Sequence, residues 1–338
     1  MATSVQTGVA QSFVTPNYSG ALFYKGNNET PFTSAIGGRR KTTQSVKFPT
    51  GQEYTGYGAG TQPHISEIAS LTAPPPTFVD REQKYNVTQI FQKSVSISYA
   101  KQSNMGTLSG LNIAGQSANP MDELTWQTAR VMENIAQDIE FTCMQGAFNE
   151  ATTDSTVNKT RGMVEAITSN VKAMGSKPLG YWDVVDLMST MYGNNAPLDN
   201  LVLWCDRVTR LQLNTSAIEN GLTVVPAARD VNGIAVDKLV TPDGTFYIRT
   251  GKYLPKGTAM LLNLGVISLV EQPVPGKGNF FREELAKTGA GTTYQIFGQL
   301  GLDHGPEWYH GKFTGIKQTW EAPKYNKIVK VVQDAAKP

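Results

Sequence analysis

Charged side chains are scarce in this sequence. Only 17% of its 338 residues are Asp, Glu, Lys or Arg, against roughly 25% in an average globular protein. A free-standing soluble protein usually carries a more charged surface than this composition supplies. Two explanations remain: uncharged polar residues cover the surface, or other protein chains bury much of it.

Other absences exclude whole classes of protein. The formal net charge is only +2, too small for a protein held to nucleic acid mainly by basic patches. No apolar run reaches the roughly 18 residues of a membrane span, and the N-terminus lacks the features of a secretory signal. The two cysteines, Cys143 and Cys205, cannot build a disulfide framework, and we expect both to be reduced and semi-buried.

Sequence motifs of nucleotide binding and nucleophilic catalysis are missing as well. One cluster near the C-terminus has residue types suited to metal or acid–base chemistry, but its spacing fits no known ligand motif, and glycine and proline interrupt any helix. We interpret it as a polar turn beside aromatic packing and expect no catalytic, cofactor-binding or metal-binding residue; a hydrolase using this region is a remote alternative. The cluster comprises Asp303, His304, Glu307 and His310, next to Trp308 and Tyr309.

The remaining polar candidates stand alone. We expect the basic triplet at 39–41 to be a solvated loop and His64 to be isolated. We interpret Asp183, Asp186 and Asp206 as helix-face or helix-cap residues. Asp154 lies in a polar loop, and the sequence suggests no partner for it.

Two long segments alternate between apolar and polar residues, as half-buried strands do. Residues 85–100 place Val87, Phe91, Val95, Ile97 and Tyr99 on one face. A second such strand near 292–302 has the right length to pair with the first. Between them lies the clearest helix, 119–146.

The helix at 119–146 has an N-cap in Asn119, a favourable first residue in Pro120 and a terminator in Gly146. Its apolar stripe predicts which side is buried. The stripe comprises Leu124, Val131, Ile135, Ile139 and Cys143, widened by Met132 and Phe141.

The segment 161–284 has short alternating helix and strand patterns, which predict a mixed sheet flanked by helices. We expect the helix beginning at Tyr181 to bury Trp182, Val185, Met188 and Tyr192 on one face. LVLWC reads as a buried strand, and Asp206 should cap the helix that follows. Further strands are predicted at LTVVP, GTFYIR and AMLLNLGVISLVE.

The first 80 residues form no core pattern of their own. Residues 1–24 carry no charge yet contain several aromatics, which suggests an arm that packs on something else. RKTTQSVKF predicts a short strand. The stretch that follows is rich in glycine and proline, with Tyr54 and Tyr57 exposed, and long ordered excursions of this kind are usually functional.

Several segments carry a resemblance to a known family. They are NYSGALFYKGNNETPFTSAIGG, SYAKQSNMGTLSGLNIAGQSANP, KTRGMVEAI and LAKTGAGTTYQIFGQLGLDHGPEWYHGKFTGI. Together with the order of arm, excursion, long strand, spine helix, α/β segment and returning strand, they resemble the tailed-bacteriophage major capsid protein of the Hong Kong 97 type. The resemblance covers roughly residues 10–320.

The resemblance implies an α+β Hong Kong 97-type capsid fold divided into named parts. Residues 1–36 would be the N-terminal arm and 37–84 the extended loop, or E-loop. The peripheral P-domain would take 85–160, with the spine helix, and a returning strand region at 285–325. The axial A-domain would take 161–284, and 326–338 would be a C-terminal tail.

The function implied by the resemblance is self-assembly of pentamers and hexamers into an icosahedral shell around phage double-stranded DNA, in the host bacterial cytoplasm. Implied partners are other copies of the chain, a portal, a decoration protein and DNA contacted without sequence specificity. Because the sequence begins at the arm, we expect the scaffold to be separate or cleaved away by a maturation protease. An encapsulin-like nanocompartment shell is the alternative, and a receptor-binding module a remote one. Lys41 and Lys47 lie on the loop, but nothing in the sequence indicates a covalent cross-link, and no membrane or cofactor is implied.

Overall fold

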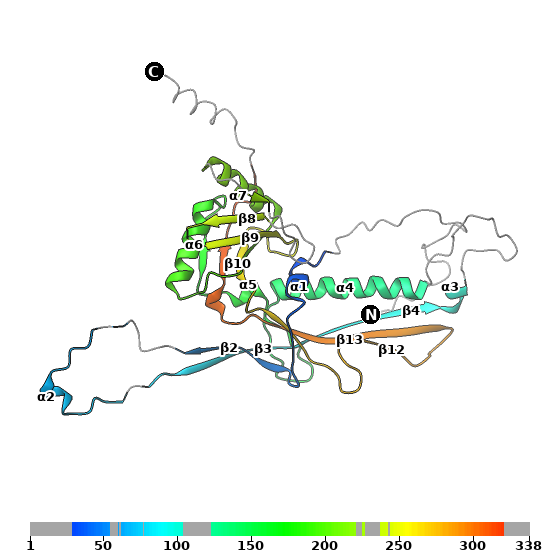
Figure 1. Cartoon of the computed structure of the whole chain (residues 1–338). Helices are drawn as coiled ribbons and strands as arrows, with labels where there is room; N and C mark the ends of the chain where they lie inside the picture. Colours follow the sequence, from blue (N-terminus) through cyan, green and yellow to red (C-terminus); the bar gives the residue numbers. More distant parts are fainter. Residues whose placement is uncertain are drawn as a thin grey trace, which may run out of the picture.

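The computed structural model describes residues 29–54, 60, 62–76, 78–103, 123–220, 225–226, 237–242 and 244–320. The predictions for most of the arm, for Tyr57, for the helix cap at Asn119 and Pro120 and for the C-terminal tail lie outside these residues. Figure 1 shows a long lower body, an upper body standing on it, and a ribbon that projects to one side.

The lower body is built on a five-stranded sheet in which the longest strand pairs with strands on both sides. The two long predicted strands pair as expected, antiparallel over ten residues, from Gly291 opposite Ser98 to Leu300 opposite Gln89. The sheet comprises β1 (Arg40–Thr42), β4 (Gln89–Ser98), β11 (Ser268–Glu271), β12 (Phe281–Glu284) and β13 (Gly291–Asp303).

The predicted strand 85–100 is divided at Thr88, because its first part belongs to the ribbon and only its second part, β4, to the lower sheet. The four predicted residues Val87, Phe91, Val95 and Ile97 are buried. Tyr99 is the exception, since it begins the short helix α3 (Tyr99–Ser103) and is exposed.

The spine helix α4 (Glu123–Gln145) covers one face of this sheet (Figure 1). Ile135 and Cys143 are buried, as the apolar stripe predicted. Met132 and Phe141 are wrongly assigned to that stripe and are exposed. The buried face of the helix is therefore narrower than the apolar stripe predicted from the sequence.

The upper body is a seven-stranded mixed sheet with helices on it, as predicted for the middle of the chain. Its strand order is β5-β14-β10-β6-β9-β8-β7, with β6–β9 and β5–β14 parallel and the other pairs antiparallel. The strands are β5 (Val171–Ala173), β6 (Leu201–Cys205), β7 (Val225–Pro226), β8 (Asp237–Thr241), β9 (Gly244–Thr250), β10 (Ala259–Asn263) and β14 (Gly311–Thr314).

All five residues of β6, the predicted buried strand LVLWC, are buried. Leu201, Leu203 and Cys205 enter a core beneath α6 (Tyr181–Gly193) and α7 (Arg207–Glu219). Val202 and Trp204 enter a second core that the upper sheet shares with α4 and β13. One sheet therefore contributes to both cores and joins the two bodies. Two further short helices are α5 (Met163–Ala166) and the 3₁₀ helix η1 (Glu307–Tyr309).

The face of α6 that was predicted to be buried is wrong at two aromatic residues. Trp182 and Tyr192 are exposed. The helix is rotated so that neighbouring positions face the core, and of the four predicted residues only Met188 is fully buried. The buried residues are Tyr181, Val184, Leu187, Met188 and Met191.

Strand pairing departs from the expected division of the chain at three places. β1, at 40–42, lies in the lower sheet, so the basic triplet at 39–41 is part of a strand edge and not a free loop. The predicted strand AMLLNLGVISLVE is really two strands, because β10 belongs to the upper sheet and β11 to the lower. β14, at 311–314, follows the returning strand but joins the upper sheet.

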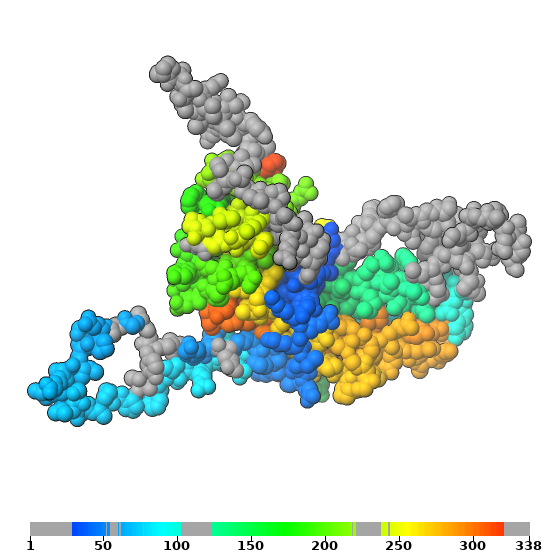
Figure 2. Space-filling model, in the orientation of Figure 1, coloured from blue at the N-terminus to red at the C-terminus, as the bar shows by residue number. Residues whose placement is uncertain are grey.

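The projecting ribbon consists of β2 (Lys47–Tyr54) and β3 (Arg81–Val87), an isolated antiparallel pair with an irregularity between Pro49 and Gln52. The predicted strand RKTTQSVKF is therefore interrupted, its ends contributing to two different sheets. The ribbon tip carries the short helix α2 (Glu67–Ser70), and Figure 2 shows it standing clear of the body. Within the described ranges, no helix is long and apolar enough to cross a membrane.

Candidate assembly surfaces

The cluster predicted near the C-terminus is buried where the chain passes from the lower to the upper sheet. The Glu307 carboxylate accepts hydrogen bonds from the backbone N–H groups of Thr168, at 2.9 Å, and Ser169, at 3.1 Å, and from the Ser169 hydroxyl. Burial acts to raise the pKa of Glu307, but these hydrogen bonds outweigh it and hold the pKa below its ordinary value. Glu307 thus serves as an ionised cap for a backbone turn.

The two histidines of the cluster are held neutral by their surroundings. His310 Nδ1 accepts from the Asn263 N–H at 3.1 Å, and its Nε2 donates to the His304 carbonyl at 2.8 Å, which fixes one tautomer. Burial lowers the pKa of His310 to about 4 and also lowers that of His304. His304 Nδ1 donates to the Gly305 carbonyl at 2.7 Å, while its Nε2 is buried with no partner among the described residues. Both rings are buried, so neither is exposed to a substrate in solvent.

Asp303 completes the cluster as an ion-pair partner. Its carboxylate accepts from the Gly305 N–H at 3.0 Å and pairs with Lys41 at 2.5 Å. Lys41 is therefore fastened to the lower body, and not part of the projecting ribbon. No group of three or more His, Cys, Asp or Glu side chains in the described part of the chain could hold a metal ion.

The other predicted polar residues have local roles. Asp206 caps α7 by accepting from the Thr209 N–H at 2.7 Å, as predicted. Asp183 accepts from the Gly180 N–H at 3.0 Å at the start of α6, and Lys172 bridges it to Asp186. His64 and Asp154 are exposed on the ribbon and on a polar loop, respectively.

The ribbon tip presents an apolar surface that no described part of the chain covers. Ile68 is 82% exposed, and Leu71 and Phe78 are each 85% exposed. Ile65 is also exposed. The sequence predicted exposed tyrosines in this excursion, and Tyr54 is exposed. The exposed aliphatic residues and Phe78 were not predicted.

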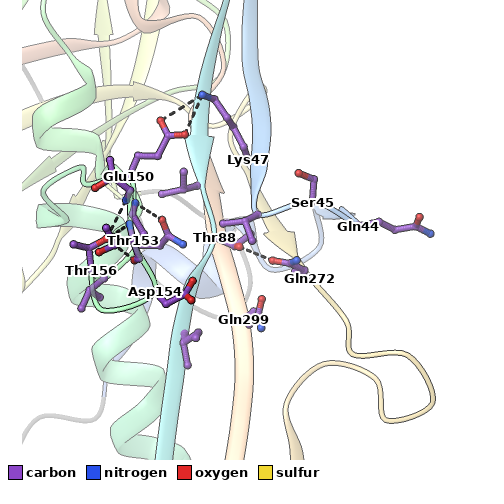
Figure 3. A pocket seen from close by; sticks show the side chains of 17 residues that line it. Gln44, Ser45, Lys47, Thr88, Glu150, Thr153, Asp154, Thr156, Gln272 and Gln299 are labelled. Atoms are coloured by element: carbon purple, nitrogen blue, oxygen red, sulfur yellow. Dashed lines mark hydrogen bonds and ion pairs between the residues drawn. The ribbon is translucent and has the colours of Figure 1, made fainter.

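A polar hollow of about 870 Å³ lies at the root of the ribbon (Figure 3). On one side the Lys47 ammonium binds the Glu150 carboxylate at 3.1 Å and lies 3.5 Å from the centre of the Tyr85 ring. This partner lowers the pKa of Glu150. Opposite them, Thr88 donates to the Gln272 side chain at 2.6 Å.

The first described helix, α1 (Pro31–Ile36), is fastened to the spine helix by one carboxylate. Glu140 accepts from the backbone N–H groups of Phe32, at 2.8 Å, and Thr33, at 2.7 Å. Burial raises the pKa of Glu140, against the effect of these two bonds. The Phe32 ring packs edge-on against Trp204 at 5.5 Å between centroids. The end of the predicted arm is thereby joined to both bodies.

Comparison with known proteins places this geometry in a group of shell proteins. A family model described as SU10 major capsid protein matches residues 5–317. Among curated proteins, none matches this sequence significantly.

Solved structures share the fold at low sequence identity. The cyanophage A-1(L) capsid protein is 9% identical with a TM-score of 0.63, over 89% of this chain and 96% of that one. The capsid protein of cyanophage P-SCSP1u is 12% identical with a TM-score of 0.55, over 89% and 92%. The SrpI encapsulin of Synechococcus elongatus PCC 7942 is 10% identical with a TM-score of 0.58, over 85% and 88%.

Proposed function

Because this chain belongs to the SU10 major capsid protein family, we propose that its ribbon, arm and two bodies supply the contacts of an icosahedral phage head. The chain is a major capsid protein, a structural component of the virion that self-assembles into a shell, and not an enzyme. Its fold is shared with both phage capsids and an encapsulin. Family membership therefore favours the phage head over the nanocompartment.

We assign the E-loop, the P-domain and the A-domain from the way the strands pair into sheets. The E-loop expected at 37–84 is, in this proposal, the ribbon with its tip, residues 47–87. The lower body with the spine helix is the P-domain, and the upper body is the A-domain, whose outer loops surround the five-fold and six-fold axes of pentamers and hexamers. The packaged double-stranded DNA is contacted without sequence specificity, in keeping with a net charge of +2.

The observation that supports this proposal best is the apolar ribbon tip. Three aliphatic side chains and a phenylalanine stand in solvent at the end of a two-stranded ribbon that leads away from the body. Several exposed apolar side chains on one projecting segment are typical of an interaction site. A neighbouring copy of the chain is the occupant that a repeating shell supplies.

The experiment replaces Ile65, Ile68 and Leu71 with serine in the full-length chain. Because these side chains are exposed, the variant should melt within a few degrees of wild type, yet form no stable shells by negative-stain electron microscopy. The matched control changes the polar side of the same tip, Glu67→Gln with Ser70→Ala, and should assemble normally. Normal shells from the triple variant would refute the role proposed for the ribbon.

Further partners of the head are proposed on family grounds alone. They are a portal, a scaffold or maturation protease, and a decoration protein. Affinity purification of assembled heads with mass spectrometry checks them directly. The same particles separate the two shell functions, since nuclease-resistant genomic DNA identifies a phage head and an enclosed enzyme identifies a nanocompartment.

A further inference from the structure

The direction in which the ribbon leaves the body is set over a few residues. β3 ends at Val87 and β4 begins at Gln89, so one strand of the ribbon continues into the lower sheet with only Thr88 between them. The other strand begins at Lys47, opposite Val87. The ribbon therefore joins the body at this root, and contacts made there can fix the angle at which it leaves.

One fully buried side chain at the root, Asn86, joins three separate segments. Its Nδ2 donates to the Leu302 carbonyl at 2.8 Å and to the Arg161 carbonyl at 3.2 Å. Its Oδ1 accepts from the Arg161 N–H at 2.8 Å and from the Val87 N–H at 2.9 Å. A carboxamide offers two donors and an oxygen with two lone pairs, so every hydrogen-bonding position of Asn86 is filled. The ribbon strand β3 is thereby bound to β13 and to the segment that precedes α5.

Phe48, the residue opposite Asn86 in the ribbon, fixes the second strand at the same level. Its buried ring lies over Gly301, where an added Cβ would approach the ring to 2.6 Å. Farther along the ribbon, Gly51 has a φ of +120°, and a Cβ there would lie 3.3 Å from the carbonyl carbon of Gly305. The close approach of ribbon and body thus depends on the absence of side chains at these glycines.

The exposed contacts at the root hold the ribbon in its direction less strongly than the buried ones do. The Lys47–Glu150 pair lies at the solvent surface, where such pairs contribute little to stability. A hydrogen bond made inside the protein is stronger, and an amide left without partners there is costly. Among the polar contacts at the root, the buried carboxamide therefore resists rotation most.

We propose that Asn86 is a positioning residue that fixes the angle between ribbon and body, and through that angle the curvature of the shell. The inference rests on the proposed function of the ribbon as the contact between neighbouring subunits. At about 3.3 Å per residue, the seven residues of β3 form a lever of about 23 Å. A rotation of about 10° at the root would move its end by about 4 Å, enough to shift the contact made by the tip.

The test follows the ribbon angle in the unassembled full-length chain through a distance between two spin labels, measured by pulsed electron–electron double resonance. Spin labels go on Gln83→Cys, in the ribbon, and Ala290→Cys, in the lower body, both exposed. The native cysteines are fully buried and stay unlabelled. Asn86→Ala should widen the distance distribution at least two-fold.

Asn170→Ala is the matched control. Asn170 is equally buried, and its side chain donates to the carbonyls of Trp308, at 2.6 Å, and His310, at 3.0 Å, but it lies in the upper body. It should lower the melting temperature as much as Asn86→Ala does and leave the distance distribution unchanged. An unchanged distribution in Asn86→Ala, or equal widening in both variants, would overturn the inference.

Two further measurements keep the outcome decisive. If Asn86→Ala shows no cooperative melt, Asn86→Asp replaces it, since a carboxylate can still accept from the Arg161 and Val87 N–H groups but cannot donate to the Leu302 and Arg161 carbonyls; a wild-type distribution there would also overturn the inference. Shells assembled from Asn86→Ala should show a shifted or broadened diameter by electron microscopy. If these shells have wild-type diameters although the distance distribution is wider, the link between ribbon angle and curvature is refuted. The proposed function of the ribbon is not affected by that result, because it is tested separately by the Ile65, Ile68 and Leu71 variant.

Discussion

Mild acid should destabilise the subunit through His310, because the folded chain holds this ring in its neutral form. Burial lowers the pKa of His310 to about 4, whereas the ring titrates near 6.5 in the unfolded chain. Between these two pH values the unfolded state binds more protons than the folded state. The stability contributed by the neutral ring is therefore complete above about pH 6.5 and falls as the pH drops toward 4. A pKa difference of about 2.5 corresponds to a loss of about 3 kcal/mol.

The assay compares wild type with His310→Gln by urea unfolding of the unassembled full-length chain from about pH 8 to about pH 4. Glutamine can accept from the Asn263 N–H and donate to the His304 carbonyl, but it does not titrate. His304 and Glu307 pack in the same cluster and titrate in both chains, so their contributions largely cancel in the difference. Wild type should lose about 3 kcal/mol more than the variant over this range. Equal pH dependence in the two chains would contradict the buried neutral histidine.

Two further substitutions test the packing of the spine helix. Ile135→Asp places an unpaired charge on the buried face of α4, where Ile135 is 2% exposed, and should abolish the cooperative melt. As the control, Met132→Asp changes an exposed position of the same helix and should melt close to wild type. A soluble Ile135→Asp chain that melts cooperatively would show that the assigned buried face is wrong. Glu140→Ala leaves two backbone N–H groups of α1 without their acceptor and should cost about 3 kcal/mol, with Glu140→Gln losing roughly half as much. Faster amide hydrogen exchange at Phe32 and Thr33 checks that α1 has been released, and unchanged exchange would show that the carboxylate does not hold it.

Local periodicity predicted the elements whose two faces differ strongly. The pairing of the strands near 85–100 and 292–302 was predictable because both alternate over a long stretch, and β4 and β13 pair as expected. The buried face of the spine helix was predictable at Ile135 and Cys143 for the same reason. Asp206 was recognisable as a cap because capping is a local interaction, between residues three positions apart.

Periodicity failed where apolar residues occur on more than one face or in adjoining strands. In α6, Trp182 and Tyr192 are large and apolar but exposed, while Tyr181 and Leu187 face the core; hydrophobicity alone did not distinguish these faces. The run from Ala259 to Glu271 has the composition of one strand, yet its halves enter different sheets.

The residues that hold the parts together gave no sequence signal. Asn86 and Arg161 are 75 positions apart, and Glu140 and Phe32 are 108 apart. Their importance comes from burial and from partners that only the folded chain brings close. The exposed aliphatic residues of the ribbon tip, in contrast, were visible in the sequence, and could have been noticed as apolar side chains within a glycine- and proline-rich excursion.

The ten-residue ladder between β4 and β13 has a mechanical consequence for a container that must withstand internal pressure. β4 continues directly from the ribbon strand β3, and β13 leads on toward the upper sheet (Figure 1). The two connections lie at the same end of the ladder, because Gln89 at the start of β4 is opposite Leu300 of β13. Tension between the ribbon and the upper sheet is therefore applied at that end, so the pairs nearest the ribbon carry the load before those at Ser98 and Gly291. Under such a load the ladder would open from the root of the ribbon, which makes the buried contacts of Asn86 and Phe48 the first resistance to it.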